Sequence, residues 1–169
     1  MTLFEVLTAA RQRIDRLDAL LLLQYATGCS HTDLLARPET PVSAPACAQF
    51  AEWVARRAAG EPLAYIVGEV EFRGRVFQVS PAVLIPRPET EVLIDLALEK
   101  LAGLANPKIL DLGTGSGIVA ISLALECPRA AVVAVDLSLE AISVARNNAG
   151  RLGANVDFWT TDKTLIQGT

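Results

Sequence analysis

Hydrophobic residues recur at helical spacing through the first 67 positions of the chain. Thr2 and Glu5 form a capping box, in which each side chain can accept an amide hydrogen at the start of a helix. Residues on one face of that helix are Leu3, Val6, Leu7, Ala10 and Ile14. Further helices are predicted over residues 18–25 with Asp18 as N-cap, and over residues 30–36, 45–60 and 63–67. Residues 1–67 are therefore expected to form a small helical bundle.

The hydrophobic pattern changes to alternation with a period of two after Gly68. Residues 70–72 and 76–79 alternate in this way on either side of Arg73 and Gly74. A two-residue connection of this kind is typical of a β-hairpin. We expect residues 68–82 to form a β-hairpin linker.

A helix and then alternating strands and helices are expected over the remainder, residues 83–169. Pro88 suits a first helical turn, and Glu89 and Glu91 favour its positive end. This helix is expected to bury an apolar face of Val92, Leu93, Leu96 and Leu101. Strands are predicted over residues 108–112, 131–135 and 156–159, with helices over 118–126 and 139–152. The apolar run 131–135 is typical of a strand buried on both faces.

Composition limits the classes of partner. Of 169 residues, 51% are hydrophobic, and the net charge of −4 gives no broad basic face for direct nucleic-acid binding. No apolar run approaches the roughly 20 residues of a membrane span, and the N-terminus does not resemble a signal peptide, so we expect a cytoplasmic protein. Three scattered cysteines and a single histidine give no pattern for a metal site.

The chemistry-bearing pattern is a glycine-rich turn between a strand and a helix, Gly113-Thr114-Gly115-Ser116-Gly117. Glycine lets a ligand approach the backbone, and the following helix offers free N–H groups. The dinucleotide fingerprint requires glycine where Ile118 stands. Asp111, just before the turn, opposes a pyrophosphate and suits a ligand with a cationic amino group and a sulfonium, such as S-adenosylmethionine (SAM).

Two further acids follow later strands. Asp136 ends the next strand, where a carboxylate can accept both hydroxyls of a ribose. Asp162 follows the third strand and can reach an adenine amino group. The alternatives are a structural glycine turn with Asp136 capping a helix, and Asp162 as a loop residue.

Four segments together resemble one family, the release factor glutamine N5-methyltransferases (the HemK/PrmC family). They are residues 60–66, 68–72, 84–91 and 109–117, and the resemblance covers about residues 1–162. It implies a helical domain that docks peptide chain release factors, a hairpin linker and a Rossmann-like class I SAM-dependent methyltransferase domain of the α/β class. In the family, SAM is bound at positions matching residues 113–117 and Asp136, and the glutamine pocket lies near Leu84, Arg87 and Thr90. We expect a cytoplasmic monomer.

The chain departs from the family pattern after Asp162. The family's next strand ends in Asn-Pro-Pro-Tyr, whose asparagine accepts hydrogens of the glutamine amide, and this tetrapeptide does not occur in the chain. No catalytic residue is therefore assigned. We expect this chain alone to bind SAM weakly, to transfer no methyl group, and to leave residues 108–112 as an open strand edge.

Other functions remain open on the sequence. The nearest is a ribosomal protein glutamine methyltransferase, which shares the SAM motif. An adenine N6-methyltransferase is disfavoured by the acidic charge balance and the helical domain, and a nicotinamide-dependent oxidoreductase by Ile118 and Asp111. A noncatalytic module that binds release factor is the alternative from another class.

Overall fold

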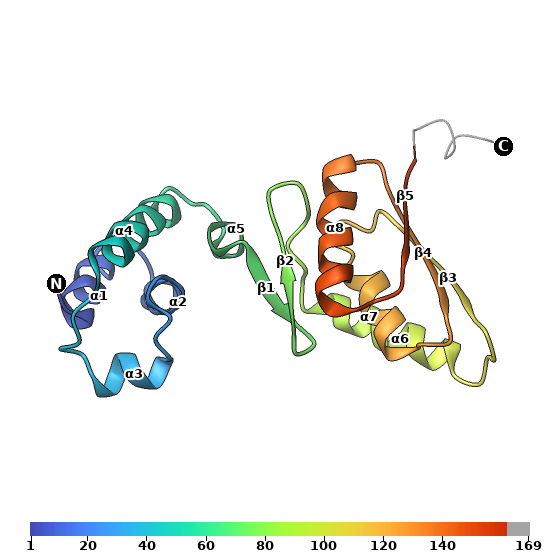
Figure 1. The fold of residues 1–169 in the computed structure, drawn as a ribbon, viewed down its shortest axis with the longest axis horizontal. Coiled ribbons are helices and arrows are strands. Elements are labelled where there is room, and N and C mark those ends of the chain that lie inside the picture. Colours follow the sequence, from blue (N-terminus) through green and yellow to red (C-terminus); the bar gives the residue numbers. More distant parts are fainter. Residues whose placement is uncertain (162–169) are drawn as a thin grey trace. The chain divides into compact units, whose positions relative to one another are not determined.

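The computed structural model describes residues 1–161 and divides the chain into two compact units. The first unit, Met1–Val67, consists of helices around one hydrophobic core (Figure 1). Its helices are α1 (Leu3–Ala10), α2 (Arg16–Thr27), α3 (His31–Ala36), α4 (Ala44–Ala58) and α5 (Leu63–Val67). The predicted helical bundle is thus present, and α2 contributes its fully buried residues, Ala19, Leu22 and Leu23.

The helix caps in this unit agree with those predicted from the sequence, with one exception. Thr2 Oγ1 accepts from the Glu5 amide at 3.3 Å, and the Glu5 carboxylate accepts from the Thr2 amide at 2.8 Å, as predicted. Helix α2 begins earlier than expected, because Asp15 is its N-cap and accepts from the Leu17 amide at 2.7 Å. The prediction that Asp18 caps this helix is wrong. Asp18 lies within the first turn and binds Arg57 Nε at 2.6 Å.

The second unit begins at Gly68 with an antiparallel hairpin of β1 (Glu69–Phe72) and β2 (Arg75–Gln78). Arg73 and Gly74 have φ of 50° and 70°, the left-handed conformation that a tight two-residue hairpin turn requires. Phe72 and Phe77 pack edge to face, with ring centroids 6.3 Å apart, in the core of this unit. The hairpin therefore belongs to the same packed body as the helices and strands that follow it.

The main sheet of the second unit is parallel, with strand order β3-β4-β5. Its strands are β3 (Lys108–Leu112), β4 (Ala131–Asp136) and β5 (Asp157–Thr160), joined by α7 (Ile118–Glu126) and α8 (Leu139–Leu152). Helices α7, α8 and the preceding α6 (Glu89–Leu101) lie on one side of the sheet (Figure 1). Within residues 1–161, β3 pairs with β4 alone, so its other edge is open.

Within residues 1–161, only one face of this sheet is buried. Val132, Ala134 and Phe158 point to the helices and are at most 8% exposed. On the opposite face Leu110, Leu112 and Trp159 are 60–69% exposed. The expectation that residues 131–135 are buried on both faces is wrong for the part of the chain described, because no element there covers the second face.

The expected apolar face of α6 also differs from the structure. Ile94 is fully buried, and Ala97, Leu98 and Leu101 pack against the same core. Val92, Leu93 and Leu96 are more than half exposed. Helix α6 carries two neighbouring apolar stripes, and the described residues cover only the one that meets α7.

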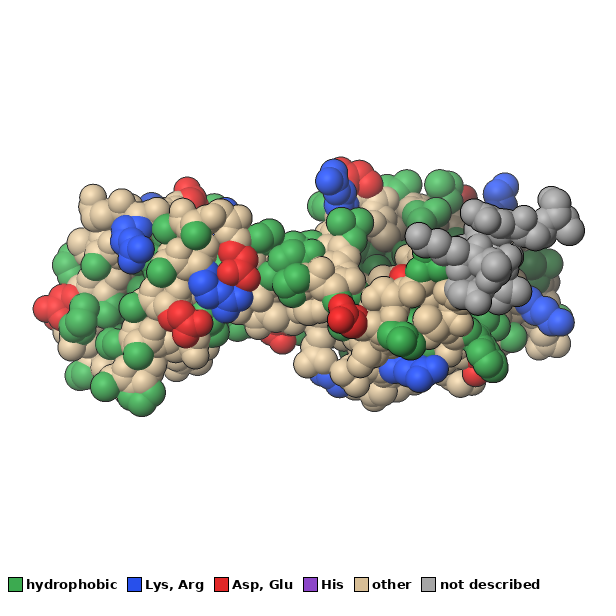
Figure 2. Space-filling model, turned by 90° about the horizontal axis from the view of Figure 1, so that it is seen from above, with side chains coloured by type: hydrophobic (Ala, Val, Ile, Leu, Met, Phe, Trp, Pro, Cys, Tyr) green, Lys and Arg blue, Asp and Glu red, His purple; other side chains and the backbone are tan. Residues whose placement is uncertain are grey.

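Acidic and basic side chains are interspersed on the face of the molecule that Figure 2 shows. This mixture agrees with the acidic balance of the sequence and gives no broad basic surface on that face. Among residues 1–161, no helix is both long and apolar enough to cross a membrane.

Candidate functional site

The glycine-rich turn lies at the carboxyl end of β3 and leads directly into α7. Gly113, Gly115 and Gly117 have φ of 75°, 56° and 80°, a conformation that residues with a side chain rarely adopt. The amides of Gly113 and Thr114 both donate to the Val135 carbonyl, at 2.8 and 3.0 Å. These bonds fix the turn against the end of β4.

Gly113 and Gly115 lack neighbours on the side where a β-carbon would project. An added Cβ would meet no atom within 4 Å at either position. The space above these two glycines is therefore open, which suits close approach of a ligand to the backbone. The first turn of α7 adds amide groups without partners inside the helix.

Gly117 has a different role in the structure. A Cβ there would lie 2.8 Å from Ile121 Cδ1 and 3.0 Å from Ala145 Cβ. Its missing side chain allows α7 and α8 to pack closely. The geometry thus shows a packing function for Gly117, and its place in the cofactor site stays a prediction.

Asp136 connects the glycine turn to the end of the second strand of the parallel sheet. One carboxylate oxygen accepts from the Gly115 amide at 2.9 Å, and the other accepts from the Ser138 amide at 3.0 Å. The residue is only partly buried. Because a carboxylate has about four acceptor positions, Asp136 retains capacity for two donors from a ligand.

Asp111 is held by the turn that follows it. Its carboxylate accepts from the Thr114 hydroxyl at 2.7 Å. Thr114 and Ser116 are buried, at 6% and 3% exposure, while Asp111 is partly exposed. The Thr114 side chain thus orients this acid.

A cleft of about 520 Å³ brings the glycine turn together with the segment that leads into α6 and with the first turns of that helix. Leu84, Arg87 and Thr90 line one side, and residues 113–116 line the other. The sequence separated these two groups by more than twenty residues, and the structure places them at one hollow. The cleft does not include Asp111, Gly117 or Asp136 in its wall, and Asp162 lies outside the described residues.

Five more residues line this cleft and were not among the predicted site residues: Pro86, Glu89, Leu93, Ile118 and Val119. Pro86 and Glu89 lie within the same segment as Arg87, so its continuity indicated them. Ile118 and Val119 are the first residues of α7. The free amides expected at the start of that helix indicated that both residues lie at the site. Leu93 is one of the exposed residues of α6, and its place at the cleft explains part of that exposure.

A buried asparagine was also missed. Asn148 lies on α8 and is fully buried, and it bonds to backbone atoms of Gln78 and Ser116. Its position is in phase with the apolar residues Ala141 and Ala145, so a polar residue on a buried face was the available signal.

An ion-pair cluster fastens the hairpin to the helices of the same unit. Arg73 binds both oxygens of Glu126, at 3.0 and 2.8 Å, and also Asp95 at 2.8 Å, and Arg75 binds Glu126 at 2.9 Å. Hydrogen bonds from Arg73, followed by those from Arg75, lower the pKa of Glu126 below its ordinary value. The hydrogen bonds that Arg73 donates to Glu126, followed by its bond to Asp95, raise the pKa of Arg73.

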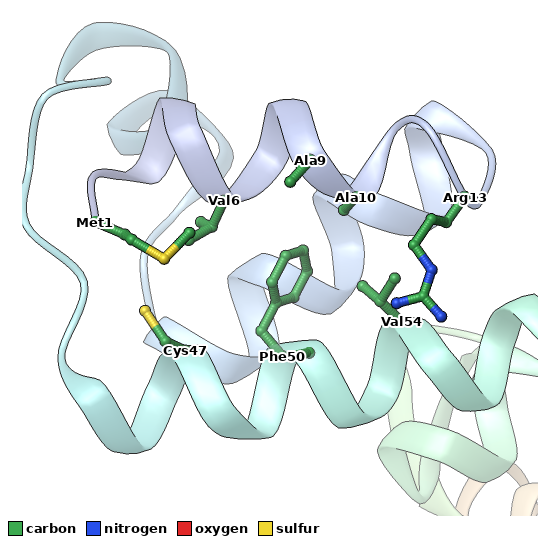
Figure 3. A pocket seen from close by; sticks show the side chains of 9 residues that line it. Met1, Val6, Ala9, Ala10, Arg13, Cys47, Phe50 and Val54 are labelled. Atoms are coloured by element: carbon green, nitrogen blue, oxygen red, sulfur yellow. The ribbon is translucent and has the colours of Figure 1, made fainter.

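The helical unit has a separate, apolar groove of about 160 Å³ between α1 and α4. Figure 3 shows Phe50 and Val54 projecting from α4 toward Ala9 and Ala10 of α1, with Arg13 at one end. Among the described residues in its wall, Arg13 alone has a charged side chain. This groove has none of the acids or free amides found around the glycine turn. Among residues 1–161, no group of histidines, cysteines and acids is placed to hold a metal ion.

Comparison with known proteins gives two family matches. Residues 3–68 match the PrmC N-terminal domain, and residues 89–166 match the methyltransferase small domain. Solved structures that are similar to part of this chain include an RNA methyltransferase from Salinibacter ruber in complex with S-adenosyl-L-homocysteine. It is 26% identical over 50% of this chain and 53% of that one, with a TM-score of 0.40.

Curated relatives are named release factor glutamine methyltransferase. Those of Burkholderia pseudomallei and Bordetella pertussis are each 50% identical over 82% and 85% of this chain, which cover 49% and 53% of those proteins. That of Moorella thermoacetica is 42% identical over 99% of this chain and 60% of its own length. The chain thus spans about half the length of the curated relatives it matches. Residues 3–68 and 89–166 thus match two different domain families, and most of the chain is similar to proteins named release factor glutamine methyltransferase.

Proposed function

We propose that this chain supplies the SAM-binding part of an enzyme that methylates a glutamine side-chain amide of peptide chain release factors. The observation that carries the proposal is the cleft in which residues 84–90 face residues 113–116. A family-specific segment and a cofactor-type turn share one hollow of about 520 Å³. A site of this size suits a small cofactor and one substrate side chain.

The chain's own groups fit SAM in charge and shape. The open space above Gly113 and Gly115 admits a ligand to the backbone. Asp136 has acceptor capacity left for the two ribose hydroxyls while it holds the Gly115 amide. Asp111, oriented by Thr114, places a negative charge near the cationic amino end.

When bound, SAM supplies an electrophilic methyl group on its sulfonium. A glutamine amide is a weak nucleophile because its nitrogen lone pair is delocalised, so transfer depends on orienting that nitrogen. We assign Leu84, Arg87 and Thr90 to the wall that receives the glutamine side chain. The remaining acceptors for its amide hydrogens are expected in the part of the relatives that this chain does not span.

The proposed partner is a peptide chain release factor, docked by the helical unit, and the proposed site of action is the cytoplasm. The curated relatives are named for this substrate. The acidic balance of the chain is consistent with a protein partner in place of nucleic acid. We propose that the chain acts as a monomer.

The test is a pair of binding measurements on the chain itself. Titration calorimetry with S-adenosyl-L-homocysteine is expected to show binding, and a pull-down is expected to retain release factor. Retention of a ribosomal protein in place of release factor would assign the other substrate. Release factor binding with no cofactor binding would support a noncatalytic module and contradict the proposal. With labelled SAM and release factor, we expect methyl transfer by this chain at background level.

A further inference from the structure

We infer that Asn148 is a positioning residue that fixes the glycine turn and the hairpin in a single arrangement around the cleft. The inference rests on the proposed function in taking SAM as the ligand. The hydrogen bonds from which it is argued are present in the chain without ligand. Asn148 is on α8, has no exposed surface, and does not itself line the cleft. It therefore acts on the site through other residues.

The side chain makes three hydrogen bonds to backbone atoms far away in sequence. Its Oδ1 accepts from the Gln78 amide at 2.7 Å. Its Nδ2 donates to the Gln78 carbonyl and to the Ser116 carbonyl, each at 2.9 Å. Both Nδ2 hydrogens are used, so the donor capacity of the amide group is fully satisfied.

These partners determine the orientation of the amide group. If Oδ1 and Nδ2 exchanged places, an oxygen would face two carbonyls and an NH2 group would face an N–H. All three bonds would be lost inside a buried site, which is costly. Asn148 is thus held in one orientation, and it holds both partners in turn.

The Ser116 bond acts on the glycine turn directly. The peptide unit between Ser116 and Gly117 is fixed at both ends, since Asn148 binds its carbonyl and the Gly117 amide donates to the Thr114 carbonyl at 2.9 Å. Gly115 and Gly117 both adopt positive φ on either side of Ser116. Because Gly117 has few steric restraints of its own, these hydrogen bonds determine the direction of the peptide unit that it shares with Ser116.

The Gln78 bonds act on the backbone that leads to the other side of the cleft. Gln78 is the last residue of β2, and the chain runs from it to the segment that contains Leu84 and Arg87. Asn148 therefore joins, through one amide group, the backbone that leads to one wall and the backbone that forms the other. Loss of this group is expected to weaken SAM binding as well as to lower the stability of the fold.

The experiment compares Asn148→Asp with Asn147→Asp, the same chemical change at the neighbouring exposed residue of α8. Aspartate at position 148 keeps an acceptor for the Gln78 amide but presents oxygen to both carbonyls. We expect affinity for S-adenosyl-L-homocysteine to fall about tenfold, the factor that corresponds to one buried hydrogen bond, with Asn147→Asp unchanged. Amide hydrogen exchange at Gly115 and Gly117, measured by NMR without ligand, is expected to accelerate in Asn148→Asp alone.

A residue that only stabilises the fold would lower the melting temperature and leave these readouts unchanged in the folded variant. Unchanged glycine exchange and unchanged affinity in folded Asn148→Asp would overturn the inference. Absence of ligand binding in the unsubstituted chain would contradict the proposed function, while glycine exchange would still decide the role of Asn148. If Asn148→Asp fails to fold, Asn148→Ala is measured in the same way. If both variants unfold, slow exchange of the Asn148 side-chain amide in the unsubstituted chain supports the inference, and fast exchange overturns it.

Discussion

The Gly115 amide donates to the Asp136 carboxylate across 2.9 Å, so a residue of the cofactor-type turn is bound to the acid that ends the next strand. One group thereby shapes the turn and keeps acceptor capacity for the proposed ligand. Substitution of Asp136 can therefore separate its proposed role in binding from its structural role.

Asp136→Asn is expected to reduce affinity for S-adenosyl-L-homocysteine at least about tenfold, because the ribose loses a charged acceptor. We expect a smaller effect on unfolding, on the order of 1–2 kcal/mol, since one of the two backbone amides loses its partner. Calorimetry and urea unfolding measure the two effects. Asp157→Asn, an exposed acid on β5, is the matched control and should change neither. Equal affinity in the two variants would contradict the assignment of Asp136.

Gly115→Ala is expected to weaken ligand binding strongly while costing about 1 kcal/mol of stability, the penalty for a left-handed alanine. An added Cβ meets no protein atom but projects into the space proposed for the ligand. The control is Gly153→Ala at the end of α8, which has φ of 70° and also no neighbour within 4 Å. The two variants should lose similar stability, and only Gly115→Ala should lose affinity. A similar affinity for both would show that the ligand does not approach Gly115.

Gly117→Ala is expected to destabilise the chain by about 2–4 kcal/mol, from the left-handed backbone and from overpacking together. The cause is the contact of the new Cβ with Ile121 and Ala145, at 2.8 and 3.0 Å. Thermal unfolding of Gly117→Ala and Gly153→Ala is compared. The difference between them gives the contribution of overpacking to the loss of stability, because Gly153→Ala carries only the backbone penalty. Equal melting temperatures in these two variants would rule out close packing as the reason for glycine at position 117.

Glu126→Gln is expected to lower stability at neutral pH by on the order of 1–2 kcal/mol, because Arg73 and Arg75 lose a charged partner. The pKa of Glu126 is lowered in the folded chain from an ordinary value of 4.5, so its contribution is complete above that pH. The contribution disappears as pH falls through the lowered pKa. Urea unfolding of both proteins should therefore show a gap at neutral pH that narrows below about pH 4. A gap that does not depend on pH would indicate lost packing in place of lost charge pairing.

Local signals were sufficient for most elements. The capping box of Thr2 and Glu5 involves residues three apart, and the turn at Arg73 and Gly74 follows from backbone sterics, so both were predictable. Asp15 and Asp18 are both reasonable caps for α2, and the sequence does not distinguish them. The N-cap is the residue whose side chain reaches a free amide of the first helical turn, and in the structure this residue is Asp15.

Non-local relationships could not be obtained in this way. The periodicity of α6 contains two adjacent apolar stripes, and only the packing partner decides that Ile94 is buried while Leu93 lies at the cleft. The roles of the glycines could be distinguished only once the distance from Gly117 to Ala145 was known. Asn148 binds residues 70 and 32 positions away, so nothing in its local sequence names its partners.

The most direct test of the central claim is an NMR titration of the isotopically labelled chain with S-adenosyl-L-homocysteine, which detects weak as well as strong binding. The account predicts that the largest shifts occur at the amides of Gly113, Gly115 and Ser116, with smaller shifts at Leu84 and Thr90 across the cleft. Shifts confined to the apolar groove of the helical unit, or no shifts at saturating ligand, would contradict it.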